Sequence, residues 1–158
     1  IVGKMWSQKM YLSLKSRNAE IESTTISVVT SDGKYFSYVL KYSKNLQVLA
    51  YNINDGIIKH NDAEVSISKT THFIANEDIA DIVVGNDSII ADSALGIKNI
   101  VKIKSLTKNI ENASFTIITK SGNVFPFNLK YTETPSNLSI YLELDTSMPS
   151  LSLNPSII

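Results

Sequence analysis

Residues 26–42 read ISVVTSDGKYFSYVLKY, a pattern that predicts two β-strands joined by a tight turn. Apolar side chains recur at every second position of the second strand, which places them on one face of a sheet: Phe36, Tyr38, Leu40 and Tyr42. Between the strands stands Asp32-Gly33, where glycine supplies the positive φ that a hairpin turn requires. The segment therefore predicts a half-buried β-hairpin.

This hairpin pattern occurs twice in the chain. Residues 115–131 read FTIITKSGNVFPFNLKY and repeat it 89 positions later, with Gly122 in the turn. Shifting the sequence by 89 aligns residues 1–42 with residues 90–131 without a gap, and twelve positions are identical. Many of the other positions exchange one apolar or strand-favouring side chain for another. Pattern and spacing together indicate an internal duplication.

Short strand signals separated by turns run along the rest of the chain, and no segment has the periodicity of a helix. Beyond the two hairpins, strands are expected at residues 10–15, 47–53, 64–75, 79–84, 89–91, 99–104 and 138–144. The predicted fold class is all-β, with two tandem small β-sandwich units of the immunoglobulin-like kind related by duplication. We assign the first unit to residues 1–55, the second to residues 56–145 and an extended tail to residues 146–158.

The two copies are unequal in extent. Residues 63–89 precede the second copy and contain the strand-like stretches 65–68 and 71–74, whereas the first copy begins at Ile1. A sandwich that lacks these strands exposes unpaired backbone groups at a sheet edge. We therefore expect an upstream segment, a neighbouring chain or a partner protein to complete the truncated first unit. Homo-oligomerisation and strand exchange are two ways in which this can happen.

The composition excludes several classes of protein. Fifteen basic and fifteen acidic residues among 158 cancel, so no global field draws nucleic acid or an anionic membrane to the chain. No cysteine is present, which excludes disulfides, thiolate zinc sites and thiol nucleophiles. No apolar stretch approaches the roughly 20 residues that span a bilayer. We expect a folded chain without a membrane span that does not bind nucleic acid directly.

Reactive side chains form no recognisable constellation. His60 and His72 lack the spacing of metal ligands, and the stretch His60-Asn61-Asp62 is interpreted as a polar turn in preference to an acid/base pair. Carboxylates in loop-like stretches are interpreted as solvated: Glu77, Asp78 and Glu111. The six glycines fall at separate turns and form no nucleotide-binding motif. We assign no catalytic, cofactor-binding or metal-binding residue and predict that the chain is not an enzyme.

Lysines and aromatic residues are the remaining candidates for a binding surface. The lysines are interpreted as a solvated sheet face opposite inward-pointing Val101 and Ile103, in preference to a basic binding stripe: Lys98, Lys102, Lys104 and Lys108, with Lys9 and Lys15 in the first copy. Trp6 aligns with Leu95 and is interpreted as a core residue. Stacking on a sugar or contact with a partner is the alternative for the aromatic residues Trp6, Tyr11 and Tyr51.

The second half of the chain contains a series of short motifs. Its parts are KTTHF at 69–73, DIVVG at 81–85, ALGIKN at 94–99, NASFTIIT at 112–119 and FPFNL at 125–129. In this order and spacing, residues 63–145 resemble the N-terminal domain of the conjugative transposon TraN family. That domain is itself similar to the periplasmic VirB-type component of type IV secretion core complexes.

The resemblance implies a secreted protein, periplasmic or associated with the outer membrane, that helps to build the envelope channel for conjugal DNA transfer without enzymatic activity. Its implied partners are other proteins of the conjugation or secretion complex. We therefore expect a scaffold protein that acts by strand pairing and sheet-face packing. The alternative is an extracellular carbohydrate-binding or adhesin-like β-sandwich module.

Overall fold

A computed structural model of the chain describes residues 2–5, 11–17, 19, 23–53, 56–111 and 113–144. These residues form β-strands and no helix, which confirms the predicted all-β class. It follows that the described part contains no helix of the length and hydrophobicity needed to cross a membrane. The chain divides into two compact units, Ile1–Leu46 and Gln47–Ile158, and each is described by itself. The predicted tail after residue 145 lies outside the described residues.

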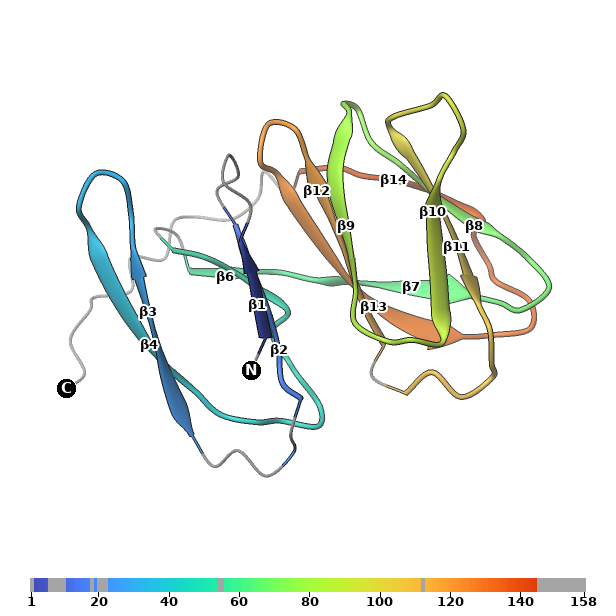
Figure 1. The fold of residues 1–158 in the computed structure, drawn as a ribbon. Helices are drawn as coiled ribbons and strands as arrows, with labels where there is room; N and C mark the ends of the chain where they lie inside the picture. The colour runs from blue at the N-terminus through green and yellow to red at the C-terminus, as the bar shows by residue number, and fades with distance from the viewer. Residues whose placement is uncertain are drawn as a thin grey trace. The chain divides into compact units, whose positions relative to one another are not determined.

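Unit 2 contains two four-stranded sheets (Figure 1). One has the order β10-β11-β8-β14 and the other β7-β13-β12-β9. In the order in which they follow one another along the chain, these strands are β7 (Asn61–Val65), β8 (Thr71–Ile74), β9 (Ile79–Val84), β10 (Ile89–Ser93), β11 (Ile100–Ser105), β12 (Ala113–Thr119), β13 (Val124–Tyr131) and β14 (Ser139–Tyr141). Six of these strands have the same neighbours as in immunoglobulin-type sandwiches, whereas β7 lies beside β13 and β14 lies beside β8.

One predicted strand, over residues 64–75, is wrong in its extent. The structure divides it into β7 and β8, which belong to different sheets. The chain turns between them, where the Ser66 hydroxyl accepts a hydrogen bond from the Ser68 amide at 3.1 Å. Where β8 begins, the buried Thr71 hydroxyl donates to the Glu64 carbonyl at 3.0 Å. These local hydrogen bonds engage backbone groups where the chain crosses from one sheet to the other, so a continuous strand is not formed.

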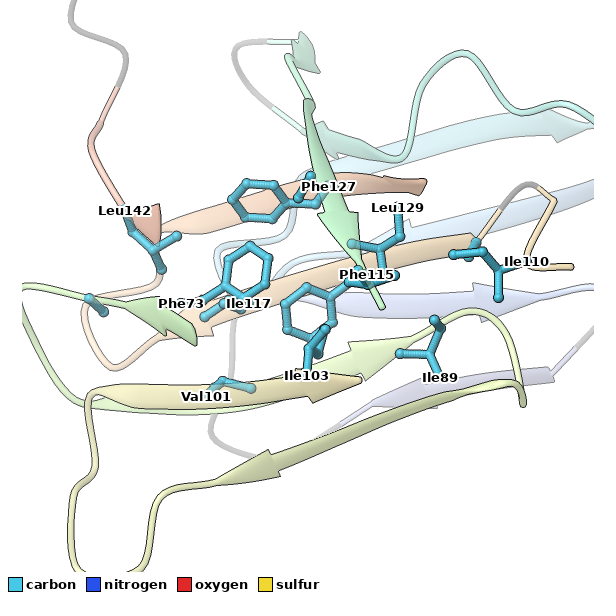
Figure 2. Packing of buried hydrophobic residues seen from close by; sticks show 14 residues of the cluster. Phe73, Ile89, Val101, Ile103, Ile110, Phe115, Ile117, Phe127, Leu129 and Leu142 are labelled. Carbon is cyan, nitrogen blue, oxygen red and sulfur yellow. The ribbon is translucent and has the colours of Figure 1, made fainter. Parts of the chain in front are cut away.

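The core of unit 2 lies between the two sheets (Figure 2). Three phenylalanines meet there, one from β8, one from β12 and one from β13, and all three are buried: Phe73, Phe115 and Phe127. The ring centroids of Phe73 lie 5.1 Å from Phe115 and 4.8 Å from Phe127, with tilted and edge-on geometry. Such contacts add to the free energy gained by removing the rings from water. Phe73 is therefore the side chain through which β8 closes the sandwich.

Unit 1 forms two separate two-stranded sheets among its described residues. One pairs β1 (Val2–Met5) with β2 (Leu12–Lys15), and the other pairs β3 (Thr24–Val29) with β4 (Tyr35–Leu40). A further hairpin of β5 (Ala50–Asn52) and β6 (Gly56–Ile58) belongs to unit 2. The prediction of a sandwich thus describes unit 2, whereas the described strands of unit 1 do not close into one.

The hairpin β3–β4 has the same register as the hairpin β12–β13. All six strand pairs of the first lie 89 positions before a pair of the second, as Ile26 with Tyr38 and Phe115 with Phe127 illustrate. The turns agree too, because Gly33 and Gly122 have φ values of 83° and 89°. In β1–β2 the register differs by one position from that of β10–β11. The repeated register therefore includes the pair β3–β4 but not the pair β1–β2.

Gly85, which follows β9, is expected to tolerate no side chain. Its amide donates to the Ser114 carbonyl at 2.8 Å, and an added Cβ would lie 2.1 Å from the Ser114 hydroxyl. Gly85→Ala is therefore expected to destabilise unit 2 by about 1–3 kcal/mol, and Ser114→Ala in the same chain to recover part of the loss. Denaturant unfolding of both variants measures this. A Gly85→Ala chain as stable as the wild type would contradict the close approach.

Candidate protein-interaction site

The outer face of the β3–β4 hairpin carries large apolar side chains in water. Val29, Tyr35 and Val39 are 67%, 65% and 67% exposed. Val29 pairs directly with Tyr35 across the two strands, and Val39 lies on the same face further along β4. The Tyr35 hydroxyl is hydrogen-bonded to that of Ser27 at 2.8 Å. We call Val29, Tyr35 and Val39 the outer patch.

The sequence contains the signal for this patch, although the alternation alone does not reveal it. Three apolar doublets place one side chain on each face of the hairpin: Val28-Val29, Tyr35-Phe36 and Val39-Leu40. The period-two alternation accounts only for the inward members of these doublets. Apolar residues on both faces of a strand indicate that both faces are buried against other protein surfaces in the functional state.

The inner face of the same hairpin is half-buried. Its side chains are Ile26, Val28, Phe36, Tyr38 and Leu40. Most of their equivalents in β12 and β13 are fully buried in the core of unit 2: Phe115, Ile117, Phe127 and Leu129. The two hairpins therefore present the same pattern, but the inner face of the second is largely buried, whereas that of the first is half-buried.

A hollow of about 590 Å³ lies at the edge of unit 2, between β7 and β14. Its walls carry Asp62, Glu64, Lys130 and the 66% exposed ring of Tyr141. The Lys130 ammonium donates to Asp62 at 2.5 Å and, with Asn128, lowers the pKa of that carboxyl. Glu64 accepts bonds from the amide and hydroxyl of Ser136, both at 2.7 Å. These charged groups are thus already engaged with one another or with the backbone.

The carboxylates at residues 77 and 78 remain accessible to solvent, as expected, and in addition they bind the β12–β13 turn. Glu77 accepts hydrogen bonds from the Ser121 hydroxyl, from the Ser121 amide at 3.2 Å and from the Asn123 side chain at 3.1 Å. The Lys120 ammonium lies 2.7 Å from Asp78. Together they fasten the β8–β9 loop to the turn. The partners are more than forty positions apart in sequence, so no local pattern reveals them.

We expect Glu77 to contribute to the acid sensitivity of unit 2. The hydrogen bond from the Ser121 hydroxyl is the main cause that lowers its pKa below the ordinary value of 4.5. A lowered pKa in the folded state stabilises the fold above pH 4.5, and the stabilisation is lost as the pH falls through the folded-state pKa. Glu77→Gln is therefore expected to reduce the change in unfolding midpoint between about pH 6 and about pH 3. An unchanged pH dependence, measured by urea unfolding with Glu111→Gln as control, would contradict this role.

The two histidines lie on different parts of unit 2, and His72 is the register partner of Lys102 across β8 and β11. His72 is half-buried on β8 and His60 lies between β6 and β7. Val101 and Ile103 are buried, and Lys102 and Lys104 alternate with them on the other face of β11, as predicted. Lys108 pairs with Glu133 at 2.5 Å. Within the part of the chain that the structure describes, no group of three acidic or histidine side chains could hold a metal ion.

Among the described residues, the aromatic candidates do not line up into a stacking surface. Trp6 and Lys9 lie outside the described residues, whereas Tyr11 is half-buried and Tyr51 is exposed on β5. The expectation that Trp6 packs in a core rested on its alignment with Leu95. That basis is wrong, because Leu95 is fully exposed in the turn between β10 and β11. A turn residue needs no apolar partner, so alignment by itself does not predict burial.

Unit 2 is an all-β sandwich of two four-stranded sheets. The chain belongs to a family described as a domain of unknown function, DUF8473, whose profile matches residues 1–46 and 63–135. The two matched segments end 135 − 46 = 89 positions apart, which equals the offset of the internal alignment. Comparison with curated proteins gives no match.

Proposed function

We propose that the chain is a non-catalytic scaffold protein that binds a protein partner through the outer patch of unit 1. The observation that carries this proposal is the exposure of Val29, Tyr35 and Val39 on one face of a two-stranded sheet. Burying a valine or a tyrosine side chain contributes about 1.5–3 kcal/mol each. Covering the outer patch therefore supplies enough free energy to anchor a protein contact.

The chemistry of the outer patch favours a protein over other partners. Its apolar rings and methyl groups alternate with hydroxyls, which suits another sheet or an extended chain: Thr25, Ser27 and Ser37. The net charge of zero offers no attraction to the phosphates of nucleic acid or to an anionic membrane.

Photo-crosslinking tests the contact in the cells that make the protein. We place p-benzoylphenylalanine at Tyr35, and at Tyr141 as the control, because the two tyrosines have nearly equal exposure. We expect one protein adduct from position 35, absent from position 141 and lost when Val29→Lys and Val39→Lys are added. No adduct at position 35, or the same adducts from both positions, would contradict the proposal.

The narrower setting that we propose is the envelope channel of a conjugative transfer apparatus, with the protein in the periplasm or at the outer membrane. This setting is supported by the resemblance of residues 63–145 to the TraN family. Deleting the gene is then expected to reduce DNA transfer between cells by orders of magnitude, and the wild-type gene to restore it. Unchanged DNA transfer would contradict a role in conjugation. The proposed protein contact through the outer patch would not be affected, because the crosslinking experiment tests it separately.

A carbohydrate-binding module is the second candidate, and the hollow beside Tyr141 favours it. An exposed ring near carboxylate and amide groups can stack on a sugar and hydrogen-bond to it: Asn61, Asp62 and Asn137 line the same hollow. A glycan array probed with the whole chain tests this candidate. Binding that Tyr141→Ala abolishes would support it, whereas an array without signal would contradict it.

A further inference from the structure

The two sheets of unit 2 leave a groove between their edge strands, β7 and β14. Among the described strands, β7 pairs with β13 alone and β14 with β8 alone. The hollow of about 590 Å³ lies between these edges, and a second hollow of about 280 Å³ continues it toward the β12–β13 turn. The two hollows share Phe125, Leu142 and Glu143. We call them together the edge groove.

The floor of the edge groove is apolar. Leu142 and Phe127 belong to the buried core (Figure 2), and Ile140 and Phe125 are partly buried against it. The register of β7 with β13 begins at Phe127, so Phe125 lies beyond the end of β7 and lines both hollows. An apolar side chain that enters the edge groove therefore contacts the core of unit 2 directly.

One side of the edge groove presents backbone groups to a further strand. The Leu138 carbonyl and the Leu142 amide each form a hydrogen bond with the backbone of β8, at 2.9 Å and 2.8 Å. Successive residues of a strand direct their backbone groups to opposite sides. Tyr141 therefore directs its N–H and C=O groups away from β8. A peptide that lies along β14 can hydrogen-bond to these two groups and extend the sheet.

The rim of the edge groove is acidic. Four carboxylates and one ammonium group line it: Asp62, Glu64, Glu77 and Glu143 against Lys130. Lys130 pairs with Asp62 at 2.5 Å, whereas Glu64 and Glu77 accept hydrogen bonds from neutral groups. The whole chain has a net charge of zero, so the excess of negative charge is a local property of this rim. It favours a partner with basic side chains.

We propose that the edge groove binds an extended peptide segment of a protein partner, in which apolar side chains alternate with lysine or arginine. The backbone of this segment adds a strand beside β14. Its apolar side chains face the floor of the groove, and its basic side chains face the acidic rim. The edge groove lies in unit 2 and the outer patch in unit 1, so this inference is independent of the contact proposed for the outer patch.

Two synthetic hexapeptides, TVKVKV and TVEVEV, test the proposal against the full chain. We expect TVKVKV to bind at least about 10-fold more tightly than TVEVEV in a titration followed by NMR. In the saturated complex, hydrogen exchange of the Tyr141 amide is expected to slow by about 10-fold or more. Equal affinities, no binding of TVKVKV, or an unchanged exchange rate at Tyr141 would overturn the proposal.

Two proline variants test whether the peptide pairs with the edge of β14. Tyr141→Pro removes the outward amide at a sheet edge, where proline is tolerated, and is expected to weaken TVKVKV binding by about 5-fold or more. Ser139→Pro is the matched control, because the Ser139 amide already donates to the Asn137 side chain at 3.0 Å. It is expected to leave the affinity unchanged. NMR signals of β12 show that unit 2 stays folded, and equal affinities of the two variants would contradict strand addition.

A charge reversal tests the acidic rim. Glu143 is exposed, and Glu143→Lys is expected to weaken TVKVKV binding by about 10-fold or more and to strengthen TVEVEV binding. Glu111→Lys makes the same change at an exposed position outside the edge groove and is expected to alter neither affinity. Equal losses in the two variants would reveal a general attraction between charges and would overturn the proposed site.

Other occupants of the edge groove give distinct results, each of which would overturn the proposal. A glycan that binds at Tyr141, together with no binding of TVKVKV, would assign the groove to a sugar. Slow exchange of the Tyr141 amide that becomes fast when residues 145–158 are deleted would assign it to that segment of the chain. A dimer that Tyr141→Pro dissociates would assign it to a second copy. None of these measurements changes the outer patch, so their failure leaves the crosslinking result at Tyr35 standing.

Discussion

Phe73→Ala is expected to destabilise unit 2 by about 3–5 kcal/mol. Phe73 is fully buried between the sheets, and its ring lies against Phe115 and Phe127, so its removal opens a cavity and loses both aromatic contacts. A small domain has about 5–15 kcal/mol of total stability, so this loss brings unit 2 close to unfolding at ordinary temperature. Denaturant unfolding followed by NMR signals of β12 and β13 measures it.

The structure offers a control for this substitution in the same aromatic cluster. Phe73→Leu keeps most of the buried volume and is expected to cost less than half as much as Phe73→Ala. The hydrogen-exchange rates of the β3 and β4 amides in unit 1 are expected to stay the same in both variants, because Phe73 belongs to unit 2. Equal destabilisation by leucine and alanine, or none by either, would contradict the role of this ring in closing the sandwich.

Leu129→Ala and Leu40→Ala are expected to differ strongly, although they change the same residue type at equivalent positions of the two hairpins. Leu129 pairs with Ala113 and is 2% exposed, whereas Leu40 pairs with Thr24 and is only half-buried. The first substitution is expected to cost about 2–5 kcal/mol and the second less than about 1 kcal/mol.

Unfolding of both leucine variants, each followed in its own unit, measures the difference. The explanation lies in burial: Leu129 is removed from water in the core of unit 2, whereas Leu40 stays half-buried. Similar losses at both positions would show that the inner face of unit 1 is already buried within the chain.

The sequence predicts the hairpins well because their signals are local. Period-two alternation and a glycine turn are both contained in residues 26–42, and the register follows from the turn. Strands without such signals are missed, as for β1 and for β6, where Gly56, Ile57 and Ile58 show no alternation. The predicted boundary between the units lies between residues 55 and 56, and the structure divides the chain after Leu46.

The candidate site depends on information that the sequence holds only in part. The outer patch is visible in the apolar doublets of β3 and β4, but its exposure depends on what covers each face in three dimensions. The bonds of Glu77 to the β12–β13 turn, like the contacts of Phe73, join segments far apart in the chain. Pairing at such distances is decided by the topology of the sheets, which local propensity does not encode.

Hydrogen exchange of two equivalent amides tests the central claim most directly. Ser27 on β3 and Thr116 on β12 occupy the same register position. Among the described strands, β12 has a further partner at its outer edge, β9, whereas β3 pairs with β4 alone. In the chain of 158 residues we expect the Thr116 amide to be protected to nearly the full stability of unit 2 and the Ser27 amide to exchange at least about 1,000-fold faster. Equal protection of the two amides would contradict the claim that unit 1 repeats the hairpin of unit 2 without its covering strands.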